Sequence, residues 1–210
     1  MGWLKTRRTE FFTVPQPVLI VCEDAKSSVY YLRKKIKSLK LHNADVEVDG
    51  NSGSAPMSVV DYAIQRKKEN KQEAKKKKQQ PYGKIFCVMD VDDHPNLKAA
   101  IEKAIANGLT PIVSNECFEL WYLLHFIDYS TKSRNRSEIN KELTPLLGKE
   151  YQKADENIFE KIRGNEAKAI ALAKKLEDAA IKENNDRNPL RNPTTEVYKL
   201  IEYLDGLVKK

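Results

Sequence analysis

Three acidic side chains, Glu23, Asp90 and Asp92, have the types and spacing to do chemistry together. Glu23 directly follows the apolar run from Pro17 to Cys22, and the two aspartates follow the apolar run from Lys84 to Met89. Residues two apart at a strand end project to one side, so Asp90 and Asp92 could hold one hard cation between them. Clustered carboxylates are costly unless a cation neutralises them. If the two runs are neighbouring strands, the pattern predicts a Mg²⁺ or Mn²⁺ site held by all three acids.

Asp93 and His94 continue the second acidic segment and are candidates for an additional part of the site. In the competing interpretation, Asp24 and Asp93 only cap the following helices. Asp90 and Asp92 are then also caps or solvent-exposed acids, and His94 is a surface turn residue. His125, in an apolar segment, is predicted to be a buried core histidine.

An Asp-X-Asp pair alone is shared by phosphatases, glycosyltransferases and receiver domains. A haloacid-dehalogenase-type phosphatase would carry it after the first strand, where this chain has a lone Glu23. A receiver domain would need a phosphate-contacting lysine after its last strands, which has no convincing counterpart here. The chain also lacks glycine-rich dinucleotide and Walker sequences, so we do not expect it to bind ATP by itself. A Ser/His/Asp arrangement is not readable in it either.

Apolar runs alternate with helical patterns along the first half of the chain, and this order predicts an α/β fold with a mostly parallel, four-stranded, Rossmann-like sheet flanked by helices. Strands are expected at 17–22, 44–48, 84–89 and 110–113, with helices at 27–39, from 56 into the lysine run, and at 96–106. Beyond Phe118 only helices are expected, including 166–180 and a last helix capped by Asn192 and Pro193. The predicted organisation is an N-terminal arm (1–16), an α/β domain (17–128) and a helical extension packed on it (129–210).

The formal net charge is +7, and the segment from Arg66 to Lys78 alone carries +6. Such a run is typical of a solvated helix, but its end, Lys75, Lys76, Lys77 and Lys78, could also follow a phosphate backbone. The three cysteines lack a metal-ligand or disulfide spacing and are expected to be buried and reduced. Neither a leader nor an apolar run of membrane-spanning length is visible, which favours a cytoplasmic protein without a membrane partner.

Four segments resemble the RloB-like family: Val21-Cys-Glu-Asp-Ala-Lys26, Val88-Met-Asp-Val-Asp-Asp-His94, Ser114-Asn-Glu-Cys-Phe-Glu-Leu-Trp-Tyr-Leu-Leu-His125 and Asn192-Pro-Thr-Thr-Glu-Val-Tyr-Lys-Leu200. The family is similar to TOPRIM proteins, in which a Glu after the first strand and an Asp-X-Asp after the third bind metal for phosphodiester chemistry. By position, the resemblance gives these roles to Glu23, Asp90 and Asp92 and places Glu119 as a further acid near the site. The chain differs from the family pattern at Asp24, Ser28 and Glu116.

The resemblance implies a bacterial or archaeal protein of anti-phage defence, abortive infection or restriction, with an AAA/ABC-type ATPase as partner. We therefore expect a Mg²⁺-dependent TOPRIM-type endonuclease acting on RNA, such as tRNA, or on DNA, with Lys26 contacting the phosphate; a homodimer is a further expectation. The alternative is a catalytically idle TOPRIM-fold module that regulates the partner ATPase. A third hypothesis is a nucleotide-binding or phosphatase domain that shares only the fold.

Overall fold

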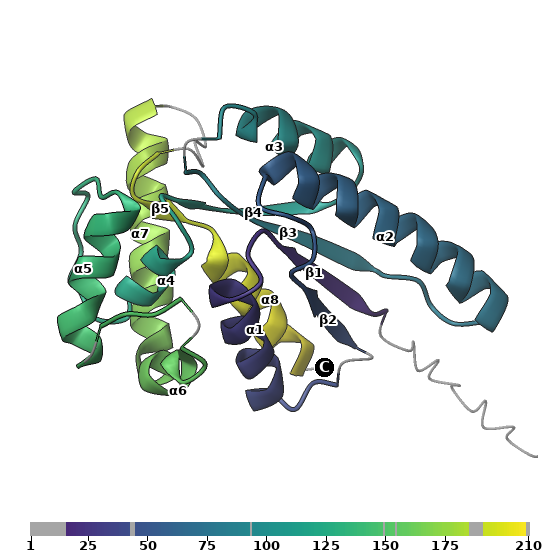
Figure 1. Cartoon of the computed structure of the whole chain (residues 1–210), viewed down its shortest axis with the longest axis horizontal. Helices are drawn as coiled ribbons and strands as arrows, with labels where there is room; N and C mark the ends of the chain where they lie inside the picture. The colour runs from purple at the N-terminus through teal and green to yellow at the C-terminus, as the bar shows by residue number, and fades with distance from the viewer. Residues whose placement is uncertain are drawn as a thin grey trace, which may run out of the picture.

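The computed structural model describes residues 16–42, 45–92, 94–148, 150–153, 155–184 and 191–208. At its centre lies one sheet with the strand order β2-β1-β3-β4-β5 (Figure 1). The first four strands pair in parallel, and β5 runs antiparallel to β4. The predicted four-stranded parallel sheet is confirmed, with one short strand added. The strands are β1 (Val18–Cys22), β2 (Val46–Asp49), β3 (Lys84–Asp90), β4 (Thr110–Asn115) and β5 (Thr194–Thr195).

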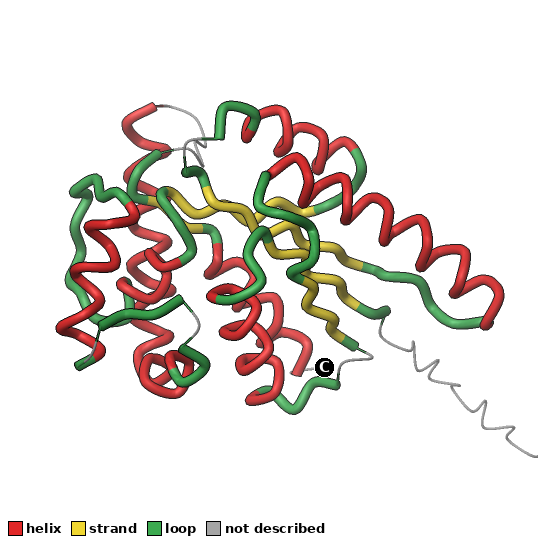
Figure 2. The backbone as a smooth tube through the Cα atoms, in the orientation of Figure 1, coloured by secondary structure: helices red, strands yellow, loops and turns green. Residues whose placement is uncertain are grey.

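Helices cover both faces of the sheet, which is why β1 is buried along its whole length (Figure 2). Leu19 and Val21 pack against α2 (Pro56–Lys77) and α3 (Leu97–Ala106) on one face. Val18, Ile20 and Cys22 alternate with them and pack on the other face, where α1 (Ser27–Ser38) and α8 (Val197–Val208) lie. The period of two residues thus divides one apolar strand between two hydrophobic clusters.

The second half of the chain supplies most of the helices on the α1 side. Aromatic rings join these helices to the sheet domain: Tyr31 of α1 contacts Phe118, Trp121, Tyr122 and Phe159, with ring centroids 5.4 to 6.4 Å apart. One hydrophobic cluster therefore contains residues from both sides of the predicted boundary at residue 128. The elements are α4 (Glu119–Leu123), α5 (Arg136–Leu147), α6 (Ile158–Ile162), the 3₁₀ turn Arg163–Asn165 and α7 (Glu166–Asn184).

The prediction that Asn192 and Pro193 cap the last helix was wrong. Residues 194 and 195 instead form β5, in which Thr195 pairs with Ser114 of β4 and their hydroxyl oxygens lie 2.8 Å apart. Helix α8 begins only at Val197. Pairing with the sheet satisfies the backbone of this segment, so the helix starts later than the local Asn-Pro signal indicates.

The predicted arm, residues 1–16, falls outside the described residues except for Gln16, and Asp93 also falls outside them. Among the helices that the structure describes, none is both long enough and apolar enough to cross a membrane.

Candidate metal centre

Glu23 and Asp90 lie side by side because β1 and β3 are adjacent parallel strands. Cys22 pairs with Val88, and the backbone N–H of Glu23 extends the pairing by donating to the carbonyl of Val88 at 3.1 Å. The Glu23 side chain turns back toward β3, where its Oε2 accepts a hydrogen bond from the Asp90 backbone N–H at 2.9 Å. Acids of the first and third strands therefore meet at the carboxyl edge of the sheet, where open α/β proteins bind ligands.

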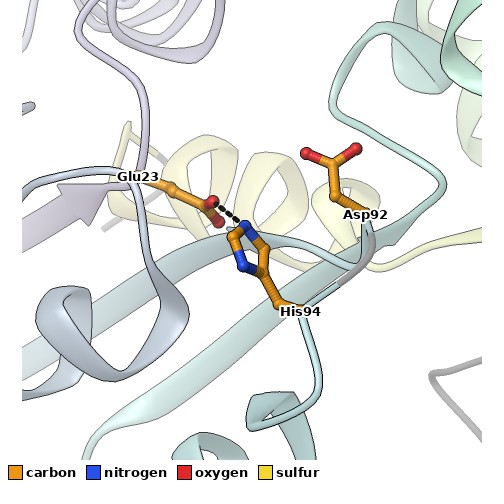
Figure 3. A group of neighbouring side chains, drawn as sticks. All are labelled: Glu23, Asp92 and His94. Carbon is orange, nitrogen blue, oxygen red and sulfur yellow. Dashed lines mark ion pairs between the residues drawn. The ribbon is translucent and has the colours of Figure 1, made fainter.

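Three side chains are grouped closely enough to hold one ion: Glu23, Asp92 and His94 (Figure 3). Each offers one ligand atom, and these atoms lie within 4.8 Å of one another. The His94 Nε2 lies 3.2 Å from Glu23 Oε1. Opposite ligands of an octahedral ion with bonds of about 2.1 Å are separated by about 4.2 Å, so small movements bring all three onto one ion. In this group His94 stands where the sequence predicted Asp90.

The loop after β3 gives Asp92 and His94 their positions. Strand β3 ends at Asp90, so the two aspartates do not follow the strand alternation that predicted a shared direction. Asp92 has a φ of 33°, in the left-handed region that non-glycine residues rarely adopt, and its N–H donates to the carbonyl of Glu116 at 3.3 Å. Backbone strain of this kind is concentrated at functional sites, which fits a role for the Asp92 carboxylate.

The loop after β1 is shaped by Asp24 and Ser28. Asp24 Oδ1 accepts hydrogen bonds from the Lys26 N–H at 2.8 Å and from the Ser28 hydroxyl at 3.2 Å, so Asp24 supports the start of α1. Gly50 allows this loop to approach the end of β2, because a Cβ there would lie only 2.9 Å from the backbone of Asp24 and Ala25. Lys26 is exposed on this loop, close in sequence to Glu23.

Arg136, at the start of α5, lies among the acids. Its Nη2 is 2.9 Å from Asp90 Oδ2 and 2.5 Å from Asp92 Oδ2, and its Nε donates to Asp92 Oδ1 at 3.1 Å. Its Nη1 lies 3.5 Å from Glu119 Oε2. One guanidinium thus faces three carboxylates, and it binds Asp92 with two nitrogens.

Glu119, the first residue of α4, is fully buried beside this guanidinium. Its Oε1 accepts hydrogen bonds from the Ser27 hydroxyl at 2.8 Å and from the Tyr151 hydroxyl at 2.9 Å. The predicted further acid therefore lies at the site, but it is held by α1 and the loop after α5 and lies outside the group of three possible ligands.

Burial raises the pKa of both Glu23 and Asp90 above the usual range of carboxyl groups. For Asp90 the negative charge of Glu119 adds to the effect of burial, and the charge of Arg136 opposes it. The Arg136 guanidinium loses solvation but gains hydrogen bonds to Asp92, so its pKa is raised and it stays charged. The site is thus an acid-rich cluster around a permanent cation.

Two open hollows adjoin Arg136. The first, of about 550 Å³, is lined by Asp92, His94, Glu116, Asn135, Arg136 and Ser137. The second, of about 560 Å³, extends along α5 toward Lys141 and Tyr151. The possible ion ligands Asp92 and His94 therefore open onto a surface hollow that can admit a substrate.

The structure does not bring Lys75, Lys76, Lys77 and Lys78 to the acids. They end α2, a helix of 22 residues that spans about 33 Å and begins near the carboxyl edge of the sheet (Figure 1). Lys75 to Lys78 therefore lie at the opposite end of the domain, exposed to solvent.

His125 is a core histidine as predicted: it is fully buried, and its Nδ1 lies 2.8 Å from the Trp121 carbonyl. All three cysteines are buried free thiols, also as predicted.

Arg136 is a residue of this acid cluster that the sequence patterns did not identify, because it lies 46 residues from Asp90 in the chain. A local signal was present. Asn135 and Glu138 form a capping box, which is readable as Asn-X-X-Glu before an apolar periodic run and places Arg136 in the first turn of a helix. The signal locates the helix but does not indicate that the helix starts at the acids.

The fold and the site together define a class: a mostly parallel α/β protein with an acid-rich centre at the carboxyl edge of its sheet. The sequence model of the RloB-like protein family matches residues 18–204, and the chain belongs to this family. No curated protein matches the chain. No solved structure matches it either.

Proposed function

We propose that this protein is a metal-dependent nuclease that hydrolyses a phosphodiester of RNA, such as tRNA, or of DNA. The observation that carries the proposal is the grouping of Glu23, Asp92 and His94 within 4.8 Å at the carboxyl edge of a parallel sheet. Two carboxylates and one imidazole are ligands that suit Mn²⁺, and the carboxylates also suit Mg²⁺. A bound ion would polarise the phosphoryl oxygens and lower the pKa of a water molecule.

The chain's own groups supply the other requirements of hydrolysis. Glu23, whose pKa burial raises, would act as a ligand of the ion or as the acceptor of a proton from the attacking water. His94, whose Nε2 lies 3.2 Å from Glu23, would serve as a ligand. Asp90 orients Glu23 through its backbone N–H. Lys26, exposed on the loop after Glu23, is a candidate for contact with a phosphate.

The family setting extends the proposal to partners. We propose that the protein is a cytoplasmic effector of anti-phage defence or restriction and that an AAA/ABC-type ATPase controls it. A homodimer belongs to the same proposal. Exposed Lys75 to Lys78 would hold a distant part of a long nucleic acid, because they lie at the far end of α2 from the acids.

A second function is favoured by Arg136. Its guanidinium already pairs with Asp90 and Asp92, so part of the negative charge of the acids is balanced without a metal ion. In this alternative the domain is a catalytically idle module that regulates the partner ATPase.

The test is cleavage of tRNA and of double- and single-stranded DNA by the purified protein, alone and with its ATPase, in Mg²⁺ or Mn²⁺. We expect Glu23→Gln and Asp92→Asn to lower the cleavage rate by about 100-fold or more. The matched control is Asp61→Asn on α2, an exposed acid whose side chain is 54% accessible. Cleavage that persists unchanged in both site variants contradicts the assignment of the cleavage to this site. ATP hydrolysis by the partner that depends on this chain, without any cleavage of nucleic acid, favours the idle module.

A further inference from the structure

Arg136 lies among the acids of the site, against Asp90 and Glu119 as well as Asp92. Carboxylate centres of phosphodiester enzymes often hold two ions about 4 Å apart, and four acids in one site are enough to bind two. Here Glu23, Asp90, Asp92 and Glu119 converge, but only Glu23 and Asp92 belong to the group that can hold an ion. Asp90 and Glu119 face the guanidinium instead.

The charges around Arg136 show why it is fixed there. Asp90 is 8% exposed and Glu119 is 0% exposed, so both carboxylates are removed from water. A buried charge without a partner is strongly destabilising, and Arg136 is the cation that the structure places against both. Its position is also fixed by the backbone, because the capping box of Asn135 and Glu138 sets the start of α5.

Asp92 is both an ion-pair partner of Arg136 and a possible ligand of the divalent ion. The guanidinium contacts both Asp92 oxygens, at 3.1 and 2.5 Å, and Asp92 also belongs to the possible metal group. Two cations close to one carboxylate repel each other, and the repulsion is stronger at a partly buried site than in water. The guanidinium therefore opposes the entry of an ion next to it.

We propose that Arg136 is a built-in second cation, which limits the centre to one divalent ion, at Glu23, Asp92 and His94, and weakens its binding. The proposal rests on the proposed function in one respect, that the centre binds a divalent ion. It makes Arg136 a positioning residue: the guanidinium fixes Asp92 and balances part of the charge of Asp90 and Glu119, with no contact to the reacting atoms.

The test counts Mn²⁺ ions by isothermal titration calorimetry in the full-length protein, with melting temperatures measured with and without Mn²⁺. Wild type is expected to bind one ion per chain. Arg136→Gln removes the charge and keeps hydrogen-bonding groups; it is expected to bind a second ion, or one ion at least about tenfold more tightly. Arg136→Lys keeps the charge and is the matched control, expected to bind one ion.

Folding is checked in the same experiment. Arg136→Gln is expected to melt below wild type without Mn²⁺ and to be stabilised by Mn²⁺ more than wild type is. Should this variant fail to fold, the double variant Glu119→Gln/Arg136→Gln removes one charge of each sign and takes its place, with tighter Mn²⁺ binding again expected.

The outcomes separate this inference from the proposed function. An unchanged ion count with equal or weaker affinity in a folded Arg136→Gln or double variant overturns the role of Arg136 and leaves the nuclease intact. If wild type binds no Mn²⁺, the metal centre is removed from the proposed function. In that case Mn²⁺ binding gained by Arg136→Gln supports the role of Arg136, and the absence of such a gain overturns that role.

Discussion

Buried acids in this centre differ in charge according to the donors that face them. Burial alone raises the pKa of Glu119, but the hydrogen bond from Ser27 and the positive charge of Arg136 more than offset it, and the net pKa is lowered. Asp90 accepts no hydrogen bond from a hydroxyl group within the part of the chain that the structure describes, and burial together with the charge of Glu119 raises its pKa. Without a metal ion, Asp90 is therefore the acid of this pair that takes up a proton more readily.

His125 gives a pH dependence that can be tested outside the site. Burial lowers its pKa to about 4, whereas an exposed histidine has a pKa of about 6.5. As the pH falls from about 6.5 to about 4, the unfolded chain takes up this proton first, so the free energy of unfolding decreases. Between pH 7 and pH 4.5 the expected loss from this residue is about 2 to 3 kcal/mol.

The measurement is urea unfolding of wild type and His125→Asn at both pH values. The asparagine amide can donate to the Trp121 carbonyl in place of Nδ1, and it does not titrate. The variant is expected to lose about 2 to 3 kcal/mol less than wild type on acidification. An equal loss in both proteins contradicts the assignment of a neutral, buried His125.

At the scale of elements, Lys35 connects three helices. This lysine of α1 is 5% exposed, and its Nζ lies 2.5 Å from Glu166 of α7 and 2.7 Å from Asp205 of α8. Tyr31, one turn earlier, donates to the other oxygen of Glu166. The helices on this face of the sheet are thus joined by a shared polar contact as well as by the aromatic cluster.

Lys35→Met is expected to lower the free energy of unfolding by about 2 to 3 kcal/mol, because it leaves two partly buried acids without their cation. Lys37→Met, two residues further along α1 at an exposed position, is the control and is expected to change stability by less than about 0.5 kcal/mol. Chemical denaturation of the two variants decides the point. Equal stability of the variants would show that the buried ion pairs contribute nothing net.

The elements of the sheet domain were predictable because their signals are local. The run Val18–Cys22 is apolar throughout, and Pro56 marks the first turn of α2 as proline does in many helices. Strand β5 was not predictable: it has two residues, too few for an alternating pattern, and it exists because β4 offers a free edge. The site divides in the same way, since Glu23 and Asp92 follow strands, whereas Arg136 reaches them only through tertiary packing.

At the scale of the whole molecule, the acids and the lysine run lie at opposite ends of the α/β domain. Glu23 follows β1 at the carboxyl edge of the sheet, while α2 carries its last lysines to the other end (Figure 1). A short substrate bound at the acids therefore cannot contact these lysines, and a long nucleic acid can reach both regions.

Replacing Lys75 to Lys78 by glutamine is expected to weaken the binding of a duplex longer than about 40 Å. It is also expected to reduce the slope of log K against log salt concentration by up to about three to four. The expected reason is that these side chains neutralise phosphates far from the site. Fluorescence anisotropy at several salt concentrations measures both effects. The matched control replaces the four lysines of α7, Lys168, Lys174, Lys175 and Lys182; equal losses in both variants contradict a specific role for the lysine run.

The central claim is that Glu23, Asp92 and His94 hold a divalent ion. Its most direct test is the anomalous diffraction of Mn²⁺ in a crystal of the protein grown or soaked with MnCl₂. The account predicts one anomalous peak at about 2.1 to 2.2 Å from an atom of each of these three side chains, with Arg136 still against Asp90. A well-diffracting crystal without a peak among these side chains, at a Mn²⁺ concentration that supports cleavage, would contradict it.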